Sequence, residues 1–461
     1  MGSDWEDINL SQIVDFMPER KIKRGLVAPF IAMADITENY KYVVEKSIKK
    51  YTGGGSKFSD GDTLFSRITP CLQNGKCSKV SGLGLGIIGH GSTEFIVLSA
   101  KFPKYDSDYI YYLTRLPHFK AYSESRMVGS TGRQRVSWQS LSEYELSVPS
   151  PEIRRNIGFI LSLFDRKIEL NRQMNLTLEG MAQALFKSWF VDFDPVIDNA
   201  LAAGNPIPDA LKAKAAQRDE QLKAAAQRGE APNAHRELFP AEFTYTEEYG
   251  WIPSGWSFKK LGESIDVLNG YAFKSKDYID SGIFVLRTKN FDPNGRVVLL
   301  NDDVYLPPDF EEDYLKYLCE PFDYHLIMVG SSIGNRGLIE PHQLPALRNQ
   351  NMWCFRPKTK SIFSKTYIKF LLDFITPFKI GLASGSARNF FRKNDFKDHL
   401  ICHPSIPILN SFEELVFPLL EKQADNNFAS SEMAKLRDTL LPKLLSGELQ
   451  VSEAAGMLEG V

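Results

Sequence analysis

The sequence contains no run of apolar residues that approaches the roughly 20 needed to cross a membrane as a helix. Its N-terminus has neither the basic segment nor the apolar segment of a secretory signal. Only 5 cysteines are present and none lies in a CxxC pair, so neither a disulfide framework nor a zinc ribbon is indicated. These absences predict a cytoplasmic protein with reduced thiols and no contact with a membrane.

Catalytic motifs are also missing. Residues 84–89 match G-x-G-x-x-G, but turn residues and a β-type run follow where a dinucleotide-binding loop needs a helix, so a glycine-rich hairpin is favoured. Residues 205–208 (NPIP) lack the second adjacent proline and the aromatic residue of an amino-methyltransferase motif. The spacing of His399, Cys402 and His403 matches no zinc pattern, and no phosphate-binding loop for ATP occurs. We predict no catalytic residue, no metal and no cofactor.

The chain as a whole has almost no excess of either sign of charge, since its formal net charge is -2. Phosphate binding requires clustered Lys and Arg, so this value alone argues against a nucleic-acid partner. Residues 1–150 and 251–405, however, each carry a net charge of +3. This mild local excess permits binding to nucleic acid without requiring it.

What the sequence does contain is one pattern written twice. The segment YIYYL at residues 109–113 returns as YIKFL at residues 367–371. Each copy is followed by a Gly/Ser loop with an arginine and an amide, which are Arg133 and Gln134 in the first copy and Arg388 and Asn389 in the second. Short β-rich pieces separated by turn dipeptides precede each copy. A chain of 461 residues is too long for one core, so the repeat predicts two α+β domains.

Each domain is followed by a stretch with helical periodicity. Ser150 and Pro151 form an N-cap and a first helical position, and a 3-4 spacing of apolar residues follows, as in a coiled-coil seam. The second stretch opens at residues 411–414 with the form of a capping box, and Pro418 should kink or delay its first turn. The alternative is two unrelated surface helices. The residues assigned to the seams are Ile157, Ile160, Phe164, Lys167, Asn171, Met174, Leu178, Met181 and Leu185 in the first helix, and Val416, Leu419, Gln423, Asn426, Met433, Leu440 and Leu444 in the second.

Both seams have a polar centre, at Lys167 and Asn171 in the first helix and at Gln423 and Asn426 in the second. In an antiparallel pair these layers would meet and fix the register of the helices at some cost in stability. The predicted organisation is a first domain at 1–150, a helix at 151–197, a linker with a short helix at 198–250, a second domain at 251–405, a second long helix at 406–450 and a tail at 451–461.

The ends of the two helical stretches carry the most specific motifs in the chain. These motifs are LEGMAQALFKSWFVDF at 178–193 and LRDTLLPKLLSGEL at 436–449, supported by GSTEFIVL at 91–98 and IPSGWSFKKLG at 252–262. With them, nearly the whole chain resembles the specificity subunits of type I restriction-modification systems.

The resemblance implies an α+β fold with two target-recognition domains of mixed α/β structure, separated by two long antiparallel coiled-coil helices in a pseudo-twofold internal repeat. It implies a non-catalytic subunit that reads a bipartite, asymmetric site on double-stranded DNA. It also implies docking of two modification subunits, which methylate adenine, and of the restriction subunits, which are the motor-nuclease. Two other hypotheses stay open at this point. One is a fused methyltransferase or nuclease with unrecognised motifs, and the other is a scaffold that does not read DNA.

Sequence reading needs Arg, Lys, Asn and Gln at groove edges, so the candidate DNA-binding residues are polar residues in turn-rich loops. A solvated surface charge is an equally good interpretation for each of them. The candidates are Lys57, Arg67, Gln73, Arg133, Gln134 and Arg135 in the first domain, and Lys289, Arg336, Arg348, Asn349, Gln350, Arg388 and Asn389 in the second. The helix ends carry too many apolar and aromatic residues for a solvated tip, so they are the candidate partner-binding surface. The candidate residues are Leu185, Phe186, Trp189, Phe190, Leu440 and Leu444.

Overall fold

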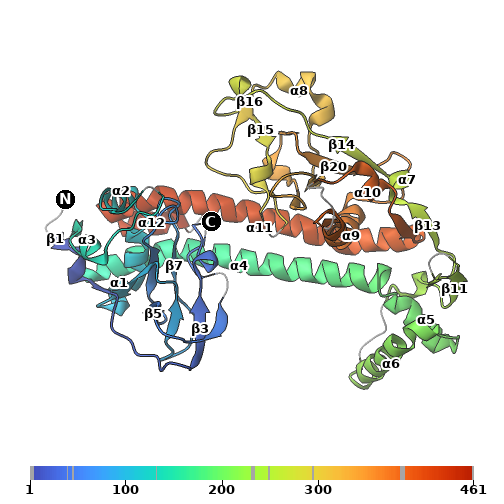
Figure 1. Cartoon of the computed structure of the whole chain (residues 1–461), viewed down its shortest axis with the longest axis horizontal. Helices are drawn as coiled ribbons and strands as arrows, with labels where there is room; N and C mark the ends of the chain where they lie inside the picture. Colours follow the sequence, from blue (N-terminus) through green and yellow to red (C-terminus); the bar gives the residue numbers. More distant parts are fainter. Residues whose placement is uncertain are drawn as a thin grey trace. The chain divides into compact units, whose positions relative to one another are not determined.

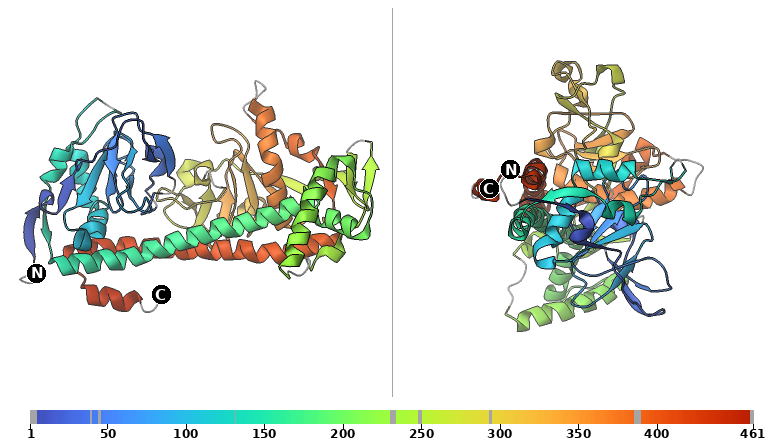
Figure 2. Two further views of the ribbon diagram at one scale, coloured as in Figure 1. Left: turned by 90° about the horizontal axis from the view of Figure 1, so that it is seen from below. Right: turned by 90° about the vertical axis from the view of Figure 1, so that its left-hand side faces the viewer.

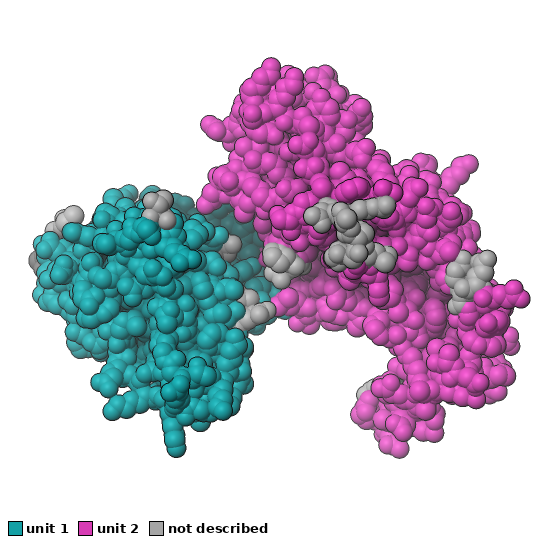
Figure 3. All heavy atoms as spheres, viewed as in Figure 1, with its two compact units in different colours: residues 1–173, 427–461 teal, residues 174–426 magenta. Residues whose placement is uncertain are grey.

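The structure, a computed structural model, describes residues 5–38, 40–43, 46–130, 132–229, 234–247, 250–292, 295–384 and 390–458. Its contacts divide the chain into two compact units (Figure 3). Unit 1 comprises residues 1–173 and 427–461, and unit 2 comprises residues 174–426. No helix in the described part of the chain has both the length and the apolarity of a membrane span.

Unit 1 contains two four-stranded sheets, in the orders β2-β9-β6-β7 and β4-β3-β8-β5 (Figure 1). The first sheet consists of β2 (Val14–Phe16), β9 (Phe95–Ala100), β6 (Thr63–Ser66) and β7 (Cys77–Lys79). The second consists of β4 (Ser47–Lys50), β3 (Val27–Ile31), β8 (Gly89–Gly91) and β5 (Ser56–Phe58). Outside them, β1 (Glu6–Asn9) pairs with β10 (Glu145–Val148), and the short helices are α1 (Pro103–Leu113), α2 (Pro117–Ser125), α3 (Trp138–Ser142) and α12 (Val451–Leu458).

Unit 2 contains a four-stranded sheet in the order β14-β20-β17-β18 and a three-stranded sheet in the order β16-β15-β19. These strands are β14 (Ile265–Asn269), β20 (Met352–Pro357), β17 (Tyr324–Ile327), β18 (Arg336–Leu338), β16 (Tyr305–Leu306), β15 (Ile283–Leu286) and β19 (Ala346–Arg348). Two further pairs are β13 (Ser257–Lys260) with β21 (Leu400–His403) and β11 (Phe243–Thr246) with β12 (Gly250–Pro253). The shorter helices are α5 (Asp194–Ala203), α6 (Lys212–Gln227), α7 (Leu261–Ser264), α8 (Phe310–Asp313), α9 (Lys365–Ser384) and α10 (Lys393–Lys397).

The two units repeat one topology, which confirms the internal repeat. The order β2-β9-β6-β7 corresponds strand by strand to β14-β20-β17-β18, and the parallel pair of β3 with β8 corresponds to that of β15 with β19. The duplicated motifs lie on the equivalent helices α1 and α9. Residues 109–113 and 367–371 are buried in the cores of their respective units. These motifs are therefore repeated because each is a buried turn of a helix that packs on the sheet of its own unit.

The two long helices are α4 (Pro151–Phe190) and α11 (Ile406–Ser446), which run side by side in both Figure 1 and Figure 2. Helix α4 begins where the N-cap predicts, and the amide of Arg154 donates to the carbonyl of Ser150 at 3.0 Å. Helix α11 begins five residues before the predicted capping box and continues through Pro418. The earlier turn is stabilised because Ile408 and Leu409 are buried in the core of unit 2.

In each unit a part of α4 packs antiparallel against a part of α11. In unit 1, Asp165 pairs with Arg437, and Asn171 Nδ2 donates to Ser430 Oγ at 3.1 Å. In unit 2, Asn426 Nδ2 donates to Asn175 Oδ1 at 2.8 Å. Within unit 1, Asn171 follows Asp165 along α4, whereas its partner Ser430 precedes Arg437 along α11. The predicted antiparallel pairing is therefore confirmed.

The predicted seam of α4 is correct at its start and wrong further along. Ile157, Ile160, Phe164 and Asn171 are buried. By contrast, Lys167, Met174 and Met181 are exposed, whereas Ile168, Asn175 and Ala182 are buried in their place. The physical reason is that a strict 3.5-residue repeat drifts by about 20° per heptad around a helix of 3.6 residues per turn. The predicted stripe therefore rotates away from α11, and Asn426 meets Asn175 rather than Asn171.

Candidate nucleic-acid interface

In the first domain, the Gly/Ser loop before α3 is attached to the end of strand β6. Val128 and Arg135 bond each other through both backbone amides, at 3.0 and 2.9 Å. The amide of Thr69 donates to the carbonyl of Gln134, and the amide of Gln134 returns a bond to Thr69 Oγ1, each at 3.1 Å. The loop thus brings Arg133, Gln134 and Arg135 beside Arg67, which follows β6.

The turn between β8 and β9 joins this group through Glu94. The amide of Arg67 donates to the Glu94 carbonyl at 3.0 Å. The guanidinium of Arg135 binds the Glu94 carboxylate with two donors, Nε to Oε2 at 2.9 Å and Nη2 to Oε1 at 2.7 Å. This hydrogen bonding from Arg135 is the main reason that the pKa of Glu94 lies below its ordinary value, and the charge of Arg67 contributes.

The other two candidates of the first domain differ in position. Gln73 is exposed in the turn between β6 and β7, the same connection that carries Arg67. Lys57 instead lies on β5 in the other sheet, opposite His90, with its ammonium 5.8 Å from the centre of the Tyr51 ring. The fold therefore gathers Arg67, Gln73 and the 133–135 loop around one strand end and places Lys57 elsewhere.

In the second domain, the equivalent turn between β19 and β20 carries Asn349 and Gln350. The amide of Gln350 donates to the carbonyl of Tyr271 at 2.9 Å. The ring of Tyr271 lies 5.0 Å from those of both Tyr314 and Tyr317. Gln350 is exposed and Asn349 is half-buried. Two amides thus lie at the rim of an aromatic cluster.

In the second domain Val329, which follows β17, bridges Phe390, as Ile68, which follows β6, bridges Arg135 in the first. The predicted Arg388 and Asn389 come immediately before Phe390 and lie outside the described residues.

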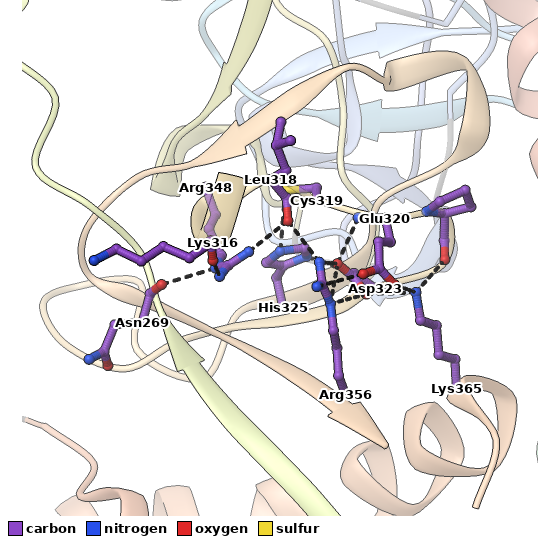
Figure 4. Close-up of polar contacts among 11 residues, drawn as sticks. Asn269, Lys316, Leu318, Cys319, Glu320, Asp323, His325, Arg348, Arg356 and Lys365 are labelled. Atoms are coloured by element: carbon purple, nitrogen blue, oxygen red, sulfur yellow. Dashed lines mark hydrogen bonds and ion pairs between the residues drawn. The ribbon is translucent and has the colours of Figure 1, made fainter. Parts of the chain in front are cut away.

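Arg348 is not available as a DNA-binding residue, contrary to the prediction. Its side chain is 1% exposed, and the guanidinium donates to three backbone carbonyls (Figure 4). Nε donates to Asn269 at 3.0 Å, Nη1 to Leu318 at 2.8 Å, and Nη2 to Lys316. Arg348 is an internal clamp, because its guanidinium ties together the backbone of three separate points of the chain.

Two other predicted cations of the second domain are engaged in ion pairs. Arg336 lies on β18 and its Nε contacts Asp373 Oδ1 of α9 at 2.5 Å, so its side chain is directed to the helix. Lys289 lies 2.5 Å from Asp302 in an exposed turn. Because an exposed pair of this kind is weak, Lys289 can exchange its partner for a phosphate more readily than Arg336 can.

The residues predicted to bind partner subunits are largely internal. Phe186, Trp189 and Phe190 belong to the core of unit 2, and the Phe186 ring contacts the rings of five other aromatic residues. Leu440 and Leu444 are 4% and 1% exposed in the core of unit 1, and only Leu185 is half-buried. The apolar helix ends are covered by the chain's own domains, so their composition does not call for a partner.

One group within the described ranges brings together residue types that bind metals, namely Asp323, His325 and Cys354. Each oxygen of the Asp323 carboxylate already has two donors (Figure 4). Oδ1 accepts from Arg356 at 2.9 Å and contacts Lys365 at 2.8 Å, while Oδ2 accepts from Arg356 at 2.5 Å and from the Glu320 amide at 2.8 Å.

Burial lowers the pKa of His325 to about 4 and raises the pKa of the Cys354 thiol well above its usual range. Both side chains are therefore uncharged at neutral pH. The carboxylate has no lone pair left for a cation. We interpret this group as a buried ion-pair network that stabilises the second domain.

Comparison with known proteins shows what the chain is similar to. Residues 2–180 match the family model described as a type I restriction modification DNA specificity domain. The HindI specificity subunit of Haemophilus influenzae is 26% identical over 97% of this chain and 100% of its own length. Nearly the whole chain is therefore similar to a specificity subunit of a type I restriction enzyme. The MjaIX specificity subunit of Methanocaldococcus jannaschii is 27% identical over 75% of this chain and 70% of its own.

The fold of this chain has a counterpart among solved structures. The S subunit of a type I restriction-modification system from M. genitalium superposes with a TM-score of 0.53, at 16% identity, over 96% of each chain. Specificity subunits are the non-catalytic, DNA-recognising subunits of these enzymes, which agrees with the missing catalytic motifs.

Glu94 and Tyr271 are not among the residues that the sequence patterns indicate. Glu94 lies within the GSTEFIVL motif, whose similarity to a known family does not by itself indicate a role in a site. An alignment of the two copies by their strands points to the turn that carries Glu94, because β8 and β19 are equivalent. The turn after β8 carries Glu94, and the turn after β19 carries Asn349 and Gln350.

Proposed function

We propose that this chain is a specificity subunit that reads a bipartite, asymmetric DNA site, with one half-site bound by each domain. The observation that carries the proposal is the equivalent position of the two candidate surfaces. In both domains a polar turn follows the second strand of the parallel pair, after β8 in the first domain and after β19 in the second. The first surface carries arginines, and the second carries amides beside tyrosines. Because arginine favours guanine and amides favour adenine in the major groove, different half-sites are expected.

The first test concerns Arg133, which is exposed at the tip of its loop. Changing Arg133 to alanine should weaken DNA binding by about 1–3 kcal/mol and relax selectivity in one half-site only, if the side chain contacts a base edge. Binding of the complete methyltransferase complex to its site and to single-base variants measures both effects. Arg155→Ala is the control, because it removes an exposed arginine from α4 that is paired with Glu152. Equal weakening on every sequence would indicate a phosphate contact, and no change would remove Arg133 from the interface.

We further propose that modification subunits dock on the exposed side of the long helices. In unit 2, Met174 and Met181 are 36% and 56% exposed and lie seven residues apart on α4. Two helical turns separate them, so they share one face, and half-buried Leu185 continues that face. Exposed methionines on a helix that is otherwise packed into its own core are typical of an interaction surface.

Changing Met181 to glutamate is therefore expected to weaken association with the modification subunit by at least about tenfold, since a charge would be buried in an apolar contact. Gln183→Glu is the matched control, because it adds the same charge to an exposed position on another face of the helix. Titration of the specificity subunit with purified modification subunit measures the affinity. Equal affinities of the two variants would place the docking surface elsewhere.

A further inference from the structure

The pair formed by Glu94 and Arg135 is positioned by the backbone on both sides. Glu94 is held in its turn because its amide bonds Ser92 Oγ at 3.1 Å and its carbonyl accepts from Arg67 at 3.0 Å. Arg135 is held because its backbone bridges both Ile68 and Val128. An exposed ion pair is usually worth little, since two long side chains must be ordered for it. Here the backbone ordering is already supplied by the fold, so the guanidinium is held in one orientation.

The way Glu94 binds Arg135 leaves a defined part of the guanidinium for another ligand. A guanidinium has five N–H donors on two usable edges, one formed by Nε and Nη2 and one formed by Nη1 and Nη2. Glu94 occupies the first edge. On the second edge, the contact that Nη1 makes with the described residues is a long one, of 3.4 Å, to the Arg133 carbonyl. The Arg135 side chain is 42% exposed.

The second edge of a guanidinium is the fork that binds O6 and N7 of guanine, the commonest specific contact of arginine in the major groove. We propose that Glu94 is a positioning residue that presents Arg135 to a guanine in the half-site bound by residues 1–150. The inference rests on the function proposed above and adds to it a base and the two residues that recognise it.

The charge balance of the surface agrees with this role. A carboxylate close to DNA repels phosphates, so a residue serving only affinity would not be acidic. Glu94 is accompanied by Arg67 and Arg135, whose charges both lower its pKa. The surface therefore stays positive while one carboxylate orders an arginine. Loss of the carboxylate should consequently reduce selectivity more than affinity.

The test uses the full chain assembled with its modification subunits and measures binding to its DNA site and to every single-base variant of that site. The wild-type complex should prefer guanine at one position of one half-site by roughly 10- to 100-fold, and Arg135→Ala and Arg135→Lys should both abolish the preference. Glu94→Gln should reduce that preference by about tenfold and leave binding to unrelated DNA equal or stronger. In the Arg135→Ala background, Glu94→Gln should not alter the base preference further, because the two residues act as a unit in recognising the base.

Several results would overturn the inference. An unchanged guanine preference in Glu94→Gln would do so, and so would an equal loss of binding on all sequences in that variant. A third such result would be that Glu94→Gln removes a preference for cytosine, and does so in the Arg135→Ala background as well. The last result would mean that Glu94 itself accepts a bond from cytosine. If the wild-type complex bound all sequences equally, the proposed function would fail. If the wild type were selective and Arg135→Ala kept its guanine preference, only the present inference would fail.

Discussion

Replacing Phe186 with alanine is expected to lower the free energy of unfolding of unit 2 by about 3–5 kcal/mol. The Phe186 side chain is 4% exposed, and its ring lies 5.3 to 6.5 Å from the rings of Phe190, Tyr367, Phe370, Phe374 and Phe412. These rings come from α4, α9 and α11, so the cavity left by alanine would be lined by three helices that cannot all move to fill it.

Chemical unfolding of the full chain, together with hydrogen exchange at the amides of residues 367–372, measures this effect and localises it to unit 2. Met181→Ala is the control on the same helix, and because Met181 is 56% exposed its loss should cost less than about 0.5 kcal/mol. A small effect of Phe186→Ala would mean that this end of α4 is not part of the core. A charge at this buried position, as in Phe186→Glu, would also unfold unit 2, so a failure of that variant to bind other subunits would report unfolding and not a lost docking contact.

Replacing Arg437 with methionine is expected to destabilise unit 1 by about 3–5 kcal/mol, the usual effect of removing one partner from a buried ion pair. Asp165 and Arg437 have side-chain exposures of 2% and 4%, and the pair joins α4 to α11. Without Arg437, the carboxylate of Asp165 would keep only the hydroxyl of Tyr112 as a partner in this buried position.

Removing both members of the pair should be less harmful than removing one. The double variant Asp165→Leu with Arg437→Met leaves no buried charge, so it should be more stable than Arg437→Met alone. Thermal and urea unfolding of the four proteins of this cycle measure the coupling. Additive effects of the two substitutions would show that the two charges do not depend on each other, and the pair would then not be what holds α4 and α11 together at this point.

The chain's repeat could be recognised from sequence because it is carried by buried residues. Tyr109 and Tyr367 lie at equivalent positions of α1 and α9, and both are buried, so selection for packing keeps such positions alike in the two copies. The helix start at Pro151 was equally predictable, since an N-cap depends on neighbours in the sequence. The seam was predicted less well, because which face of α4 meets α11 depends on the partner helix and on small residues such as Ala182.

Which polar side chains are exposed to solvent could not be predicted from the sequence in the same way. Arg348 and Asn349 are adjacent and both polar, yet the structure buries the first and leaves the second half-buried. The carbonyls that hold Arg348 belong to Asn269 and Leu318, which are 79 and 30 residues away. Glu94 likewise meets Arg135 across 41 residues.

The sequence by itself therefore determined the doubled α+β architecture, the two long helices and the resemblance to a known family, because local periodicity, caps and long motifs are properties of neighbouring residues. Only the tertiary structure decided which arginines are exposed, which apolar helix residues are core and which are exposed, and which acidic residue orders an arginine. Those properties depend on contacts between segments far apart in the chain. The burial of a polar or apolar group is set by what packs against it, and no local pattern records that.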